Sequence, residues 1–226
     1  MIALLVILTF ATAILLDHLL LRQPVIFAEE APAPEAATPR PRRVPAVIAG
    51  FEVPENLRYH PGHMWAAAEG PNLVRVGIDD FAAKLAGDVT KIDIPERGRW
   101  IRQGQKLVSM HRSGKEIDLV SPIEGTIVAV NEEAIRNPKT TRNDPYGEGW
   151  LIAVNSPDAK TNFRNLLTGS VARRWMDDAA ARLRALVTVT PGIAMAQDGG
   201  IAVDDVLNHV PAEEWEKVAR EFFLTA

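Results

Sequence analysis

Between Phe51 and about residue 154, short apolar runs alternate with clusters of turn residues. The runs are rich in valine, isoleucine and leucine, and we expect them to form strands at residues 73–78, 89–94, 106–110, 116–120, 125–130 and 149–154. Sequences such as PERG, RQGQ and SPIEG separate them. Many short strands at this spacing predict an all-β sandwich or barrel. Helices interrupt this pattern at residues 79–85 and 131–136.

The pattern becomes helical after Pro157. NFRNLLT at residues 162–168 is a short candidate helix, and residues 170–187 form a longer one with a serine at a plausible N-cap position. Near the C-terminus an amphipathic helix carries Trp215 and apolar residues three and seven positions later. We expect this last helix to dock on its own domain, and binding to a partner or a membrane surface is the alternative.

The first 16 residues form an unbroken apolar run, and Asp17 and His18 separate it from three further leucines. A membrane-spanning helix needs ~20 residues, so residues 1–22 predict a transmembrane anchor. A secretory signal cleaved after Ala28 is the alternative. Because no lysine or arginine precedes the apolar run, and signal peptides carry a basic leading segment, we favour the retained anchor.

Positive charge follows the apolar run and none precedes it, with arginines at positions 22, 40, 42 and 43. The positive-inside rule then predicts a single-pass membrane protein whose soluble part lies on the cytoplasmic side. A proline- and alanine-rich stretch follows, which we expect to be a semi-extended spacer. The expected domains are the anchor at 1–22, the linker at 23–50, a mainly β domain at 51–187 and a C-terminal extension with the amphipathic helix at 188–226.

Composition narrows the function classes. The chain has 226 residues, 47% of them apolar and 24% charged, as in a folded globular protein. The formal net charge of −4 gives no reason to expect a nucleic-acid partner, because such proteins cluster lysine and arginine. Cysteine is absent from the sequence, which excludes disulfides, thiolate metal sites and a cysteine nucleophile.

The remaining candidates for chemistry have structural explanations. His60, His63 and His111 could suggest a metal site, but no carboxylate lies at ligand spacing beside the first two. The paired acids at 79–80 and 132–133 stand beside predicted helices, where they favour the N-terminal dipole. We therefore predict no metal site, no catalytic residues and no enzyme activity.

Three segments together resemble the H protein of the glycine cleavage system. These are RYHPGHMW at 58–65, the stretch beginning VGIDDFAAKLAGDV at 76, and NDPYGEGWL at 143–151, which is the most specific match. The resemblance covers roughly residues 59–186. It implies a mainly β, lipoyl-type barrel–sandwich hybrid of two small antiparallel sheets with short flanking helices. In that family a lysine at the tip of a β-hairpin carries lipoate, which reaches the active sites of partner enzymes.

The lysine itself departs from the family pattern, which is close to E-S-V-K-A-x-S-D-x-x-S-P. With Asp118 and Ser121 as anchors, the position of the family lysine is Gly114, and Lys115 comes one residue late. The family glutamate is replaced by His111 or Arg112, depending on the register. Because side-chain direction alternates along a strand, Lys115 should leave the hairpin at a different angle from the family lysine.

The resemblance therefore leaves two hypotheses. We favour a membrane-tethered interaction or scaffold module that carries no cofactor because its lipoyl site is lost or altered. The alternative is a working carrier in which Lys115, the candidate attachment residue, bears lipoate and shuttles an aminomethyl group and electrons. The expected partners are proteins of a membrane-associated or glycine-cleavage-type complex, and the anchor raises the local concentration near a membrane partner.

Overall fold

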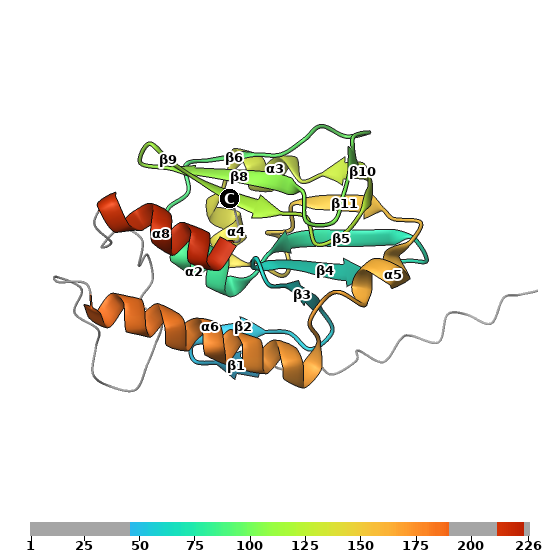
Figure 1. Ribbon diagram of the computed structural model, residues 1–226. Helices are drawn as coiled ribbons and strands as arrows, with labels where there is room; N and C mark the ends of the chain where they lie inside the picture. Colours follow the sequence, from blue (N-terminus) through green and yellow to red (C-terminus); the bar gives the residue numbers. More distant parts are fainter. Residues whose placement is uncertain (1–45, 190–211, 224–226) are drawn as a thin grey trace, which may run out of the picture. The chain divides into compact units, whose positions relative to one another are not determined.

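A computed structural model describes residues 46–189 and 212–223 of the chain (Figure 1). The predicted anchor at 1–22, and with it the predicted membrane topology, lies outside these residues. So do most of the predicted linker and much of the C-terminal extension. Within the described ranges, every helix is too short or too polar to cross a membrane.

Three antiparallel sheets make up the β part of the structure. The largest has the strand order β3-β4-β5-β11-β10-β7, and the second has the order β6-β8-β9. A small third sheet pairs β1 (Ala46–Ile48) with β2 (Phe51–Val53). The strands of the first two sheets are β3 (Arg58–His60), β4 (Met64–Ala68), β5 (Leu73–Ile78), β6 (Lys91–Asp93), β7 (Trp100–Ile101), β8 (Lys106–Arg112), β9 (Lys115–Val120), β10 (Gly125–Val130) and β11 (Ile152–Asn155).

Short helices flank the sheets, and two longer ones follow them in the chain. They are α2 (Asp80–Ala86), α3 (Glu132–Arg136), α4 (Lys139–Asn143), α5 (Ala159–Phe163), α6 (Gly169–Val189) and α8 (Ala212–Phe223). Asp79 and Asn131 cap α2 and α3, because their side chains accept hydrogen bonds from backbone N–H groups of the first turn. The paired acids noted in the sequence thus lie at helix starts, as predicted.

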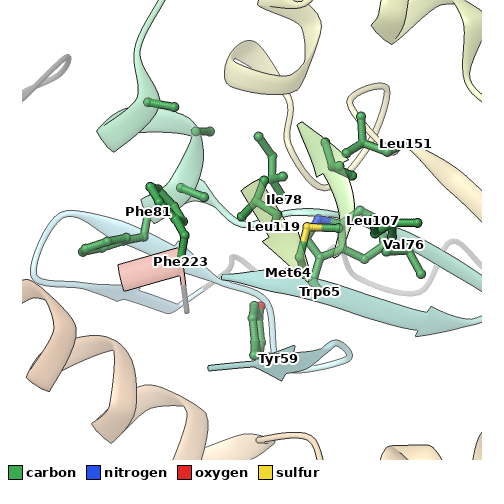
Figure 2. Close-up of a cluster of buried hydrophobic side chains, with 14 of the residues drawn as sticks. Tyr59, Met64, Trp65, Val76, Ile78, Phe81, Leu107, Leu119, Leu151 and Phe223 are labelled. Carbon is green, nitrogen blue, oxygen red and sulfur yellow. The ribbon is translucent and has the colours of Figure 1, made fainter. Parts of the chain in front are cut away.

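A single hydrophobic core joins the two larger sheets and the C-terminal helix. Figure 2 shows Met64, Val76 and Ile78 of the larger sheet beside Leu107 and Leu119 of the smaller one. Phe223 of α8 belongs to the same buried cluster. The predicted mainly β class with short flanking helices is confirmed, and so is the docking of the amphipathic helix on its own domain.

The boundaries of several elements differ from the sequence prediction. The strands at 73–78 and 125–130 agree, but β8 is two residues longer and β11 begins at Ile152. Ala46–Ile48, expected to end the linker, forms strand β1 because it pairs with β2 across a turn at Ala49 and Gly50, both at positive φ. The last residues of the predicted linker therefore form a strand.

The NDPYGEGWL segment has a structural role. Both carboxylate oxygens of Asp144 accept backbone N–H groups, from Gly147 at 3.0 Å and from Glu148 at 2.9 Å. The indole of Trp65 donates to the carbonyl of Pro145 at 3.0 Å. A Cβ at Gly149 would lie 2.6 Å from the Asp144 carbonyl oxygen, so only glycine fits there. This motif thus has the structural role that its sequence predicts.

Candidate functional site at the β8–β9 hairpin

The tip of the β8–β9 hairpin is a two-residue loop, Ser113–Gly114. Both residues have positive φ, 48° and 76°, as a type I′ turn requires. Arg112 and Lys115 form the last cross-strand pair below the loop. The apex is therefore Ser113–Gly114, and a side chain added at Gly114 would meet nothing within 4 Å.

The register of the hairpin decides where the Lys115 side chain points. Met110 pairs with Ile117 and Val108 pairs with Leu119, and all four are buried. Since alternate residues of a strand share a face, Lys115 lies on the same, inward face as Ile117 and Leu119. Its cross-strand neighbour Arg112 is only 5% exposed, and its guanidinium donates to the carbonyl of Ala86.

Helix α8 covers this inward face of the hairpin beside Lys115. The ammonium nitrogen of Lys115 lies 4.9 Å from the centre of the Trp215 ring, within cation–π range. Trp215 is itself 6% exposed, and Lys115 is half-buried. α8 contacts β9 along this face, so the amine is held against the protein's own C-terminal helix.

The outward face of the hairpin carries charges that neutralise one another. Lys106 pairs with Asp118 at 2.7 Å and with Glu116 at 3.0 Å. These hydrogen bonds, to Asp118 and then Glu116, raise the pKa of Lys106, and the Lys106 contact lowers the pKa of Glu116. Asp93 bonds Lys91 and His111, at 2.7 Å each, and its pKa is lowered by Lys91 first and also by His111.

His63 lies in a buried aromatic cluster under α8. Its Nδ1 is 2.8 Å from Asp79, and the ring stacks on Phe81 with centroids 4.2 Å apart. The rings of Trp175, Phe222 and Phe223 complete its surroundings. Among the described residues its Nε2 has no hydrogen-bond partner although the side chain is fully buried. The predicted packing and hydrogen-bonding role of this histidine is confirmed.

The three histidines considered for a metal site have separate environments. His60 accepts a hydrogen bond at Nδ1 from the Gly62 amide at 3.0 Å, and burial, with a smaller effect of His63, lowers its pKa. His63 bonds Asp79, whereas His111 bonds Asp93 on the outward face of the hairpin. Across residues 46–189 and 212–223, no group of three or more potential ligands could hold a metal ion.

Two features of the site were not predicted from the sequence. The amphipathic pattern of α8 indicated a docking helix, but nothing in the pattern indicated that Trp215 would cover Lys115. The exposure of Trp100 on β7 was not predicted either: its side chain is 49% exposed, because side chains alternate along the strand and its neighbour Ile101 takes the inward position.

Comparison with known proteins places this geometry in a family. The family model described as "Glycine cleavage H-protein" matches residues 57–179. The glycine cleavage system H protein of Nocardia farcinica is 39% identical over 106 residues, which are 47% of this chain and 80% of that protein. The one from Anaeromyxobacter sp. (strain K) is 37% identical over 110 residues, 49% of this chain and 85% of that protein.

Among solved structures, the chain resembles the crystal structure of a glycine cleavage system H protein from Mycobacterium marinum. The sequence identity is 31%, the TM-score is 0.49, and the match covers 56% of this chain and 98% of that one.

The chain belongs to the glycine cleavage H-protein family, because the family match spans more than half of its length. This membership agrees with the prediction that the protein is not itself an enzyme. The matched segment ends ten residues before the end of α6 and does not include α8.

Proposed function

We propose that this protein is a glycine cleavage H-protein-like interaction module whose lipoyl site is altered, and that it works through contacts with other proteins. The observation that carries the proposal is the geometry of the hairpin. Its apex holds Gly114, and the nearest lysine, Lys115, lies on the inward face beneath Trp215. A prosthetic arm must project from an exposed turn to reach partner active sites, and an amine held in this way does not fit such an arm.

The second candidate function is lipoyl carriage on Lys115 within a glycine-cleavage-type complex. The observation that favours it is the name of the relatives described above, glycine cleavage system H protein. These names match the carrier hypothesis better than the interaction-module hypothesis. Lipoate would supply a dithiol–disulfide couple, and this chain has no cysteine of its own.

Intact-mass measurement after co-expression with a lipoate ligase separates the two candidates. For the interaction module, wild type gains no mass. The matched control is Gly114→Lys, which puts an amine at the apex, where an added Cβ meets nothing within 4 Å. This variant should gain one lipoyl group, and the gain shows that the ligase recognises the hairpin.

Lys115→Arg completes the set. If wild type gains one lipoyl group and Lys115→Arg does not, the chain is a carrier and the interaction-module proposal is wrong. If Gly114→Lys alone is modified, the proposal stands. If no variant is modified, the ligase does not recognise this hairpin, and the intact mass of the protein from its native host then decides between the two candidates.

We also propose that residues 1–22 anchor the module to a membrane with its folded part on the cytoplasmic side. The unbroken apolar run and the arginines that follow it support this proposal. A membrane-associated complex is then the expected partner. Full-length protein should sediment with membranes and resist extraction by carbonate, and a variant without residues 1–22 should become soluble. A truncated variant that stays with the membranes would contradict the anchor.

A further inference from the structure

Helix α8 runs from the hairpin tip to the loop that precedes β4. At one end Trp215 lies over the ammonium group of Lys115. At the other end Phe222 and Phe223 are buried, and a Cβ on Gly62 would lie 3.3 Å from the carbonyl oxygen of Phe223. One apolar face of α8 therefore covers the whole path from the hairpin tip to His63.

Helix α8 lies outside the part of the chain that matches the family. The family match ends at residue 179, and α8 begins at Ala212. The relatives align over roughly half of this chain while covering 80% or more of their own length. The part that this chain shares with the family therefore precedes α8, and the helix is an addition to it.

Docking of α8 leaves one polar group unsatisfied. The imidazole of His63 is ringed by four aromatic side chains, two of which, Phe222 and Phe223, belong to α8. Its Nε2 has no partner among the described residues. A buried polar atom without a hydrogen bond opposes burial, so the docked state is less favourable than its apolar contacts alone imply.

An exposed contact links α8 to helix α6. Arg182 donates to Glu221 at 3.2 Å, and both side chains are more than two-fifths exposed. The same guanidinium lies 5.6 Å from the centre of the Phe222 ring. Exposed ion pairs contribute little to stability, so this contact holds α8 against α6 only weakly.

We propose that α8 is a reversible cap that masks the Lys115 amine when docked and exposes it when released. The proposal goes beyond the assigned family role and does not depend on whether lipoate is ever attached. In this proposal, the position of α8 controls whether other molecules can reach Lys115. A partner that needs this lysine, or the inward face of β9, must first displace α8.

Amine acylation of the full-length protein tests the cap. Sulfosuccinimidyl acetate acetylates a neutral lysine amine: the amide bond forms, the ester bond breaks, and N-hydroxysulfosuccinimide and the amine proton leave. Peptide mass spectrometry follows each site. Lys160 on α5 is the internal reference, since it is exposed and its ammonium group makes no hydrogen bond or ion pair in the part of the chain that the structure describes. We expect Lys115 to react about tenfold more slowly than Lys160 in wild type, because the ring contact withdraws the amine from solvent.

Variants on α8 should change the rate at Lys115 alone. Trp215→Ala should bring it close to the Lys160 rate, and Trp215→Phe, which keeps a ring, should retain most of the protection. Trp100→Ala is the matched control, because Trp100 is an exposed tryptophan on β7, at the end of the six-stranded sheet, whereas the hairpin belongs to the three-stranded sheet. It should leave the Lys115 rate unchanged.

A surface variant tests the same proposal if Trp215→Ala does not fold. Glu221→Lys opposes Arg182 without touching the core and should raise the Lys115 rate about twofold, the range of an exposed ion pair. Combining it with Arg182→Glu should restore protection. Equal rates at Lys115 and Lys160 in wild type, or a Lys115 rate that no α8 variant changes, would overturn the cap.

Discussion

Lys106 and Lys115 begin the two strands of one hairpin, yet their ammonium groups have opposite surroundings. Lys106 lies on the outward face with Glu116 and Asp118, and its side chain is 54% exposed. Lys115 lies on the inward face beneath an indole ring. The first amine is held by ions that salt can screen, and the second by an aromatic ring and burial that salt hardly affects.

The comparison shows that the ammonium groups of both hairpin lysines already have partners within the protein. Alternation places Lys115 on the face of Ile117 and Leu119, whereas the register shift between Lys106 and Val108 places Lys106 on the other face, opposite Val120. Gly114, in the loop, belongs to neither face. The location of Lys115 one residue after the apex therefore changes its chemistry, and not only its reach.

The largest expected effect comes from the core beneath Lys115. Ile117→Ala removes a side chain that is 1% exposed on the inward face, and we expect a loss of about 3 kcal/mol in the free energy of unfolding. Urea unfolding followed by tryptophan fluorescence measures it. Glu116→Ala, one residue away on the outward face, is the control and should have a much smaller effect. Equal losses for the two variants would contradict the assignment of faces.

The next effect concerns the hairpin apex. Gly114→Ala forces a Cβ into a residue with φ of 76° and should destabilise the protein by about 1 kcal/mol. Gly70→Ala is the matched control, because its φ is not in the left-handed region and an added Cβ would meet only Leu73 at 3.8 Å. Thermal unfolding of the two variants compares them. If Gly70→Ala cost as much, the turn geometry would not be the cause.

Local patterns predicted the part of the fold that depends on neighbouring residues. The strands at 73–78 and 125–130 follow from alternating apolar residues between turn signals, and the structure has them at the same bounds. Asp79 and Asn131 are the first residues of the helices predicted at 79–85 and 131–136, and in the structure they are the N-caps of α2 and α3. Strand β1 was missed, because three residues of a proline- and alanine-rich stretch become a strand only through pairing with β2.

The candidate site was predictable only in part. Counting from Asp118 located Gly114 and Lys115 correctly on the hairpin, because register along one strand is a local property. The neighbour of Lys115 was not predictable, since Trp215 follows it by a hundred residues and nothing local fixes where α8 docks. The buried ring of aromatic side chains around His63 depends on the same long-range contact.

The effect of salt on stability should differ between variants of the two lysines. Lys106→Met removes exposed ion pairs and should cost less than about 1 kcal/mol at low salt, and almost nothing in 1 M NaCl, where the Debye length is about 3 Å. Lys115→Met removes a cation–π contact of about 0.5–1 kcal/mol that should persist in salt. Urea unfolding at both salt concentrations checks the pair. A salt-dependent loss at Lys115 would mean that its amine is held by charges instead of by Trp215.

The smallest expected effect is on how the free energy of unfolding depends on pH at acidic pH. Lys106 lowers the pKa of Glu116 in the folded protein from its ordinary 4.5. The folded state therefore binds this proton less readily than the unfolded chain. The contribution of the carboxylate is present above pH 4.5 and is lost as the pH falls from there through the lowered folded value. Lys106→Met should flatten the stability profile between about pH 5 and pH 3.

The inward lysine provides the contrast in the same experiment. The cation–π contact between Lys115 and Trp215 involves no carboxylate, so Lys115→Met should shift the whole profile between about pH 5 and pH 3 without changing its slope. Lys160→Met, on exposed α5, is the control and should change neither height nor slope. Urea unfolding at half-unit pH steps measures all three profiles. A slope change for Lys115→Met would show an acidic group near its amine, and the two faces of the hairpin would then be alike.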